Sequence, residues 1–213
     1  MKKSILILTL FAMVTAGAFA QDISLDMRVS RVDLNGTEAG APSFIPGLGL
    51  AVGLGAVEIL LDLEFWRTGE NDEYSVTGFT EELSWALNYF SIAAGVAPVV
   101  PAAQRLTLTF PIMLQFARAS FNSTLSETGQ DDIDISIARN SFGLNFGART
   151  FLSISQNWSV FLGAQISPVT VEFTPSSEVS SGGTTIDLME DQTLTTTTWF
   201  GKGRIDLGVR FRF

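Results

Sequence analysis

The sequence predicts an all-β fold in which eight antiparallel strands close into an up-and-down transmembrane β-barrel. Three observations predict it: apolar and polar residues alternate over eight segments, the connections between them are alternately long and short, and the N-terminus carries a secretion signal. The eight segments are 23–30, 47–55, 58–65, 83–97, 106–117, 141–149, 158–173 and 199–213.

Residues 1–20 have the organisation of a cleavable signal peptide. Lys2 and Lys3 precede an apolar run, and Ala18 and Ala20 form a small-x-small cleavage site. The alternative is an inner-membrane anchor, but the run is shorter than the roughly 20 apolar residues that a spanning helix needs. We therefore expect residues 21–213 to form a single mature domain.

The first three strands follow from period-two alternation. In 23–30, Ile, Leu, Met and Val alternate with Ser, Asp and Arg, and the turn-rich segment 35–43 then predicts a loop. Glycines alternate with apolar residues in 47–55, and Glu58, Asp62 and Glu64 alternate with apolar residues in 58–65. Each segment therefore has one apolar and one polar or small-residue face.

The two middle strands each contain an irregularity. In 83–97 the apolar phase slips near Phe90, which predicts a β-bulge. The segment 106–117 alternates regularly but contains Pro111, which cannot donate a ladder hydrogen bond. We expect a local bulge or a distorted ladder at this proline.

The last three strands complete the set. The segment 141–149 alternates regularly, and 158–173 follows a short turn at 153–157 and changes phase at Pro168. In 199–213 the odd positions are apolar or glycine, whereas Lys, Arg and Asp occupy even positions. This strand has the clearest division into two faces.

The connections assign the two ends of the barrel. The long connections are 35–43, 68–82, 122–137 and 174–197, and the intervening connections are short. In outer-membrane barrels the short turns are periplasmic and the long loops extracellular. Both termini are then expected at the periplasmic end.

A soluble β-barrel or sandwich would also alternate, so the polar face must decide the orientation. It combines charges with many small residues, which suits the narrow interior of an eight-stranded barrel. Aromatic residues near strand ends fit interfacial girdles: Phe65, Trp85, Trp158, Trp199 and Phe213. We expect the apolar face to contact lipid.

Residues 21–213 resemble the small eight-stranded outer-membrane barrels of the OmpA-transmembrane-domain and OmpX type. The most specific match is the terminal strand from Gly208 to Phe213. The resemblance implies a bacterial outer-membrane location and biogenesis through periplasmic chaperones and the barrel assembly machinery. It also implies that Phe211 and Phe213 belong to the signal that this machinery recognises.

The charges on the polar face predict a network inside the lumen. An unpaired charge buried there would cost several kcal/mol, so acids and bases are expected to pair across the barrel. We expect Asp62 and Glu64 to pair with Arg149 and Arg204 and to close the lumen. The full set is Asp62, Glu64, Arg149, Lys202, Arg204, Asp206 and Arg210. The alternative is a narrow passive channel for ions or small solutes.

The composition argues against catalysis and nucleic-acid binding. The chain has no His and no Cys, so neither a Ser-His-Asp triad nor a Cys nucleophile can form. A paired-carboxylate site at Asp62 and Glu64 is the remaining alternative. The formal net charge is −9, and becomes −11 once Lys2 and Lys3 are removed. We predict no enzyme, no catalytic residue and no cofactor.

The long connections concentrate the acidic residues. They contain no Lys or Arg but hold 14 of the 22 Asp and Glu residues. We expect a structural or surface-interaction role, such as adhesion, with divalent cations or a basic surface partner at these loops. The alternative is that the loops are merely solvated. Asp131, Asp132 and Asp134 lack the Gly and Glu of an EF-hand loop, so no metal site is predicted.

Overall fold

The structure, a computed structural model, describes residues 22–34, 44–76, 79–127, 129–173, 176–187 and 196–213. The predicted signal peptide 1–20, with Ala18 and Ala20, and the loop 35–43 lie outside these residues. No helix in the described residues is long and apolar enough to cross a membrane. The strands are β1 Asp22–Leu34, β2 Ile45–Gly53, β3 Val57–Val76, β4 Phe79–Ala103, β5 Leu106–Thr109, β6 Ile112–Glu127, β7 Ile133–Ser153, β8 Trp158–Glu172, β9 Ser176–Ser181, β10 Thr184–Asp187 and β11 Thr196–Arg212.

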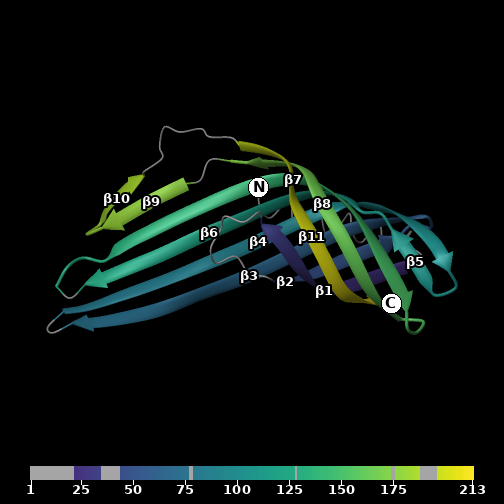
Figure 1. Ribbon diagram of the computed structural model, residues 1–213, viewed down its shortest axis with the longest axis horizontal. Coiled ribbons are helices and arrows are strands. Elements are labelled where there is room, and N and C mark those ends of the chain that lie inside the picture. The colour runs from purple at the N-terminus through teal and green to yellow at the C-terminus, as the bar shows by residue number, and fades with distance from the viewer. Residues whose placement is uncertain (1–21, 35–43, 77–78, 128, 174–175, 188–195) are drawn as a thin grey trace.

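These strands form one antiparallel sheet that closes into a ring of eight positions. Neighbouring strands pair in chain order from β1 to β4, and β7, β8 and β11 continue the ring. β5 and β6 share the position between β4 and β7. Pairing of β11 with β1 closes the ring, which confirms the predicted eight-stranded architecture (Figure 1).

The single position shared by β5 and β6 is interrupted at Pro111, as the sequence predicts. β5 ends at Thr109 and β6 begins at Ile112, yet both pair with β4 and β7 in the same register. The carbonyl oxygen of Pro111 still accepts a 2.9 Å hydrogen bond from the Gly147 amide. The proline therefore removes a donor without displacing the strand.

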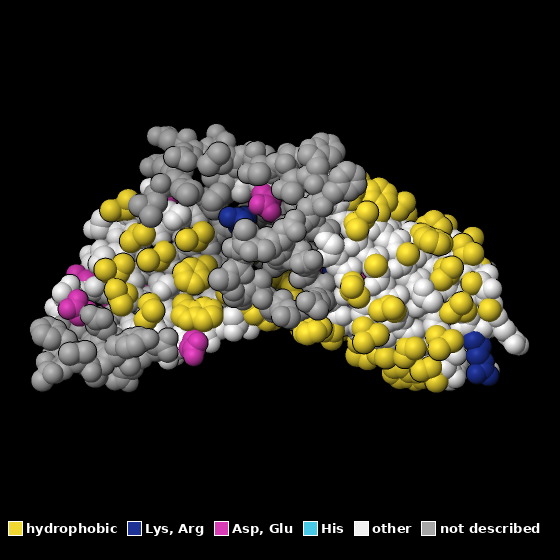
Figure 2. Space-filling model, in the orientation of Figure 1, with side chains coloured by type: hydrophobic (Ala, Val, Ile, Leu, Met, Phe, Trp, Pro, Cys, Tyr) yellow, Lys and Arg dark blue, Asp and Glu magenta, His cyan; other side chains and the backbone are white. Residues whose placement is uncertain are grey.

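The two faces of the barrel wall have the polarity expected of a protein surrounded by lipid. Polar and charged side chains on the lumen face are buried, including Asp26, Asp206 and Arg149 at no more than 1 % exposure. Large apolar side chains on the other face are exposed, including Leu207 at 63 % and Leu162 at 58 %. Figure 2 shows hydrophobic side chains spread over the outer surface of β8 and β11.

The long connections are more regular than expected. β3 and β4 remain paired as far as Val76 and Phe79, and β6 and β7 as far as Leu125 and Ile133. Most of 68–82 and 122–137 is therefore strand, and the prediction of loops there was wrong. Polar residues indicated turns, but they also suit strands that leave the apolar belt and enter water.

The connection 174–197 contains a hairpin that the alternation did not reveal. β9 and β10 pair around Gly182 and Gly183, whose positive φ angles of 56° and 79° suit a tight hairpin turn. β9 also pairs with the first residues of β7. Together with the extended β3, β4, β6 and β7, this hairpin forms a sheet that projects beyond the ring (Figure 1). We call it the projecting sheet.

The phase slip near Phe90 is not a bulge. β4 pairs without a register shift with β3 and with β6 on either side of this residue. An unbroken strand keeps its alternation, so Leu83, Trp85 and Leu87 share the lumen face with Ser91. The expected lipid-facing girdle position of Trp85 was therefore wrong. Beyond the apolar belt, the apolar residues of β4 lie on the lumen face instead of the outer face, while the register of the strand stays the same.

The phase change at Pro168 is a real irregularity. The register of β8 shifts against β7 between Leu144 and Phe146, and against β11 between Trp199 and Lys202. Both shifts lie beside Pro168, whose missing N–H favours such a break. The prediction of a phase change there is confirmed.

Candidate functional site

Nine charged side chains meet across the lumen on the half of the barrel nearer the short turns. Five are acids and four are arginines, drawn from strands on all sides of the ring. Their formal charges therefore almost cancel. They are Asp26, Arg28, Glu58, Asp62, Glu64, Arg149, Arg204, Asp206 and Arg210, and we call them the lumen network.

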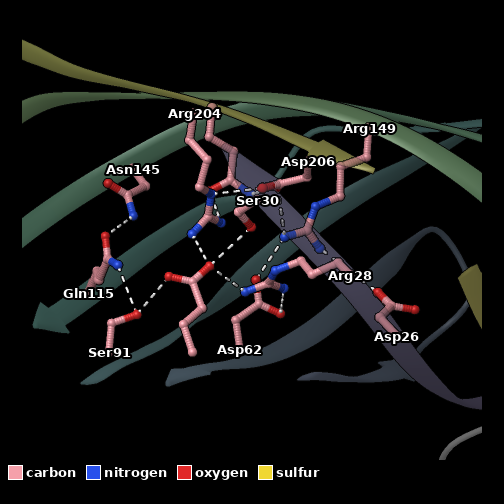
Figure 3. Close-up of polar contacts among 12 residues, drawn as sticks. Asp26, Arg28, Ser30, Asp62, Ser91, Gln115, Asn145, Arg149, Arg204 and Asp206 are labelled. Atoms are coloured by element: carbon pink, nitrogen blue, oxygen red, sulfur yellow. Dashed lines mark hydrogen bonds and ion pairs between the residues drawn. The ribbon is translucent and has the colours of Figure 1, made fainter. Parts of the chain in front are cut away.

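The centre of the lumen network is Asp62 on β3. Its carboxylate accepts a hydrogen bond from Arg149 Nη2 at 2.7 Å, and Arg28 Nη1 lies 2.7 Å from Oδ1. Both arginines point toward this carboxylate, Arg28 from β1 and Arg149 from β7 (Figure 3). Arg149 Nη2 also lies 3.8 Å from an oxygen of Asp206, so side chains from β1, β3, β7 and β11 meet at this level.

Glu64 forms the part of the network nearer the projecting sheet. It accepts hydrogen bonds from Arg204 Nη1 at 2.6 Å, Arg28 Nη2 at 3.2 Å and the Ser91 hydroxyl at 2.9 Å. Arg204 also lies 2.9 Å from Asp206 Oδ1. The side chain of Glu64 is only 1 % exposed, and its charge is therefore compensated by direct contacts rather than by water.

Arg210 forms the part nearer the short turns. It donates two hydrogen bonds to Asp26, at 2.6 and 2.9 Å, and one to Glu58 at 2.7 Å. Its guanidinium carbon lies 4.0 Å from the centroid of the Phe151 ring, an arrangement that favours a cation–π interaction. This end of the network is thus held by a bidentate pair and an aromatic face.

The structure brings together six of the seven residues predicted for the network. The pairs expected from the sequence, Asp62 with Arg149 and Glu64 with Arg204, are in direct contact. Arg210 lies in the same network but contacts Asp26 and Glu58 instead. Lys202 is placed in β11 by its backbone, but its side chain lies outside the described part of the chain.

The two phenylalanines of the expected assembly signal lie at the short-turn end. The Phe211 ring packs 4.9 Å from Trp158 and 5.0 Å from Phe213, measured between ring centroids. Phe213 is 71 % exposed. Its amide donates to the Ile23 carbonyl at 3.0 Å, which places the C-terminus beside the start of β1.

No protein-family model matches the chain, and no curated protein is similar to it in sequence. Solved structures match it in fold. A major outer membrane protein from Thermus thermophilus has a TM-score of 0.53 and 14% identity over 90% of this chain and 98% of that chain. The chain has the fold of a small outer-membrane β-barrel.

Two further outer-membrane barrels have lower TM-scores. Ail, the attachment invasion locus protein of Yersinia pestis, was solved with the heparin analogue sucrose octasulfate; it has a TM-score of 0.47 and 18% identity over 90% of this chain and 97% of that chain. The protease OmpT of Escherichia coli has a TM-score of 0.42 and 11% identity over 90% of this chain and 95% of that chain. A shared fold does not specify an activity, so the function must be argued from this barrel's own residues.

A ladder of uncharged polar side chains extends the lumen network of the barrel. Ser91 accepts a 3.1 Å hydrogen bond from Gln115, whose carbonyl accepts one from Asn145 at 2.7 Å. Ser167 in turn donates to Asn145, and Gln165 donates to Asp206 at 3.1 Å. The sequence analysis missed these residues, although their positions on the polar face of each strand could have indicated them.

Glycines on the lumen face give the charged side chains their space. A Cβ atom at Gly49 would lie 2.7 Å from Asp62 Oδ1 and 3.2 Å from Asp26 Cβ. A Cβ atom at Gly163 would lie 2.8 Å from Arg149 Cγ. The alternation of glycine and apolar residues in β2 is therefore a packing requirement of the lumen network.

The substitution Gly49→Ala is expected to destabilise the barrel by about 1 to 3 kcal/mol, because the added methyl group displaces a carboxylate held by two arginines. The free energy of unfolding in urea, measured in phospholipid vesicles, checks this. Gly203→Ala is the matched control, since no atom of the residues that the structure describes lies within 4 Å of a Cβ there. Equal stabilities of the two variants would contradict the packing role of Gly49.

Proposed function

We propose that this protein is an integral outer-membrane barrel with a closed lumen, and that it acts at the cell surface through the projecting sheet and its acidic residues. The lumen network carries the first part of the proposal. Arg149 and Asp206 are 1 % and 0 % exposed, although both lie on the face that would line a pore. An eight-stranded barrel is narrow enough for such side chains to fill it.

The outer surface supports the membrane location. Apolar side chains exposed by more than a third occur at all eight positions of the ring, for example Met27, Leu48, Ile92, Leu114 and Ile205. A surface of this extent is unfavourable in water and favourable in hydrocarbon. With the lipid-facing belt so placed, the short turns and both ends of the mature chain are periplasmic, and the projecting sheet is extracellular.

The projecting sheet supports the surface role. Together with the connection between β6 and β7, it exposes Asp131, Asp132, Glu178 and Asp187 and apolar side chains such as Ile186, which is 57 % exposed. Among the described residues no three acidic side chains gather as they would around a metal ion. We therefore favour a basic macromolecular partner, attracted by a dispersed negative charge, over a bound cation.

We propose no catalytic activity. The sequence contains neither His nor Cys, so neither a Cys nucleophile nor a His-activated Ser is available. Asp62 contacts Arg28 and Arg149, and Glu64 contacts Arg28 and Arg204. Both carboxylates therefore lie against arginines rather than in an open cleft, which argues against a paired-carboxylate site. The buried carboxylates are better explained as one half of an ion-pair network.

A narrow passive channel is the second candidate. The ladder formed by Ser91, Gln115, Asn145 and Ser167 continues the polar lumen from Glu64 toward the projecting sheet. A polar path of this kind would suit ions if the lumen network opened. The two candidates differ in whether the folded barrel conducts ions: a barrel with a closed lumen does not, and a passive channel does.

One pair of variants separates these functions in phosphatidylcholine membranes. The wild-type barrel is expected to show no steady single-channel current and to bind fluorescent polylysine. Arg204→Ala should lower the stability and leave both readouts unchanged. Replacing Asp131, Asp132, Glu178 and Asp187 with their amides should remove most polylysine binding. Steady current steps from the folded wild-type protein would instead support the channel, and unchanged polylysine binding by the amide variant would refute the acidic surface.

A further inference from the structure

The outer wall of β3, β4 and β6 changes character just beyond the apolar belt. Phe65 is 60 % exposed and Phe90 is 42 % exposed, and these two residues are direct neighbours across the β3–β4 ladder. Arg118 on β6 is the next neighbour of Phe90 in the same row. The row therefore joins two exposed rings, which belong to the belt, to an exposed guanidinium group.

The next rows toward the projecting sheet are polar. Arg67 neighbours Asn88, which in turn neighbours Ser120 on β6. The following row contains the small residues Gly69 and Ala86 beside Asn122. These side chains share the outer face because each ladder is unbroken and side chains alternate between the two faces.

A groove of about 370 Å³ occupies this face. Gly69 and Ala86 form its shallow centre, and longer polar or charged side chains stand around them. Its lining residues are Arg67, Gly69, Asn71, Ser84, Trp85, Ala86, Asn122 and Thr124. The Trp85 side chain lies on the lumen face, and the backbone oxygen of this residue lies beside Gly69. Asn122 Oδ1 accepts a hydrogen bond from Ser136 at 3.0 Å, whereas its Nδ2 group bonds to no described residue. That amide remains a donor for a bound molecule.

The charge on this face is opposite to that of the chain. Neither Arg67 nor Arg118 has a carboxylate partner in the part of the chain that the structure describes. The nearest acidic side chains on the outer face of these rows belong to β7 and β9. They are Asp134, which accepts a 2.6 Å hydrogen bond from Thr124, and Glu178, which neighbours Ser136 in the row of Asn122. An isolated cationic band thus separates the apolar belt from the acidic projecting sheet of a chain with a net charge of −9.

We propose that this band binds the phosphorylated headgroup of an anionic lipid in the leaflet on the projecting-sheet side. The proposal rests on the membrane location proposed above. Arg67 and Arg118 would pair with phosphate oxygens, because a guanidinium group matches phosphate bidentately. Asn88, Ser120 and Asn122 would bond the remaining headgroup oxygens. The acyl chains would lie along Phe65, Phe90 and the belt below them.

A lipid explains both halves of this surface better than a soluble anion. The arginines lie at the boundary where the outer face changes from exposed aromatic rings to amides and hydroxyls. A free phosphate would use the polar groups and leave the adjoining rings without a role. A lipid with a charged head and apolar tails matches charge with charge and hydrocarbon with hydrocarbon.

The test uses the full barrel in nanodiscs of phosphatidylcholine that contain a small fraction of diphosphorylated lipid A. Lipid A retained per barrel after extraction is quantified by mass spectrometry over a titration. A basic residue near an anionic surface contributes about fivefold in binding, so Arg67→Gln/Arg118→Gln is expected to retain about 25-fold less lipid A. Arg67→Lys/Arg118→Lys should retain more than the Gln variant, because lysine keeps the charge.

The matched control is Arg105→Gln/Arg212→Gln, which removes two exposed arginines from the short-turn end. This control is expected to retain lipid A as the wild type does. Equal losses of lipid A in the two Gln variants would show a general charge effect and overturn the site. The site would also be overturned if the wild-type barrel retained lipid A without phosphates as well as it retains diphosphorylated lipid A. A wild-type barrel that fails to insert into any nanodisc would overturn the membrane location as well, whereas insertion without lipid preference would overturn only the lipid site.

Discussion

Replacing Arg149 with alanine is expected to destabilise the barrel by about 3 to 5 kcal/mol, the range observed when one partner of a buried ion pair is removed. Arg149 contacts Asp62 at 2.7 Å and lies within 4 Å of Asp26 and Asp206. Its loss leaves five buried carboxylates with three guanidinium groups. Few other changes in this protein would leave so much negative charge uncompensated among side chains that are almost fully buried.

The free energy of unfolding of Arg149→Ala can be measured in urea with the barrel folded into phospholipid vesicles. Arg139→Ala is the matched control, because the Arg139 side chain is 47 % exposed and its pairing with Glu172 spans 3.6 Å. An exposed pair of this kind contributes about 0 to 1 kcal/mol. If Arg149→Ala were as mild as Arg139→Ala, the lumen network would not be a dry, paired structure.

Once Arg149 has been replaced, removing a neighbouring carboxylate should restore part of the lost stability. Arg149→Leu/Asp62→Leu removes the closest ion pair and replaces it with apolar volume, a change that is often tolerated inside proteins. Arg28 keeps its contact with Glu64 in this double variant. We expect the double variant to be more stable than Arg149→Leu alone, and additive losses would contradict direct coupling between the two side chains.

Replacing Leu207 with arginine is the second change expected to have a large effect. Leu207 lies in the middle of the apolar face of β11 and is 63 % exposed. Arginine facing lipid near the bilayer midplane costs about 2 to 4 kcal/mol in a transmembrane barrel. On a surface in water, the same substitution would change stability by about 0.5 kcal/mol or less.

Ile186→Arg supplies the matched control for this experiment. Ile186 is 57 % exposed but belongs to β10, in the projecting sheet. We expect this control to unfold at nearly the same urea concentration as the wild type, and Leu207→Arg to unfold at a clearly lower one. Two variants of equal stability would mean that β11 does not face hydrocarbon, and would refute the membrane location.

Local sequence was sufficient to predict the orientation of the barrel wall. Side chains alternate strictly along a strand, so the order Ile205, Asp206, Leu207 places Asp206 opposite its two neighbours. The structure has Asp206 at 0 % exposure and the flanking residues at 57 % and 63 %. The strand count could be predicted for the same reason, since each alternating segment occupies one position in the ring.

Local sequence was not sufficient where solvent changes along a strand. Leu83, Trp85 and Leu87 are apolar like residues of the belt, yet they lie on the lumen side of β4, beyond the lumen network. The preferred face depends on whether lipid or water lies outside, and a residue pattern does not record that depth. The same cause hid the strands of the projecting sheet, because their polar residues resemble those of loops.

The sequence by itself determined the fold class, the inward direction of the charges and the absence of the side chains that most hydrolases use. Only the tertiary structure decided which charges pair: Asp26 and Arg210 lie 184 residues apart, and Asp62 and Arg149 lie 87 apart. Alternation specifies a face, whereas pairing depends on the register and closure of the whole ring. The tertiary structure also decided where Arg67 and Arg118 lie, because neighbours on a sheet surface come from different strands.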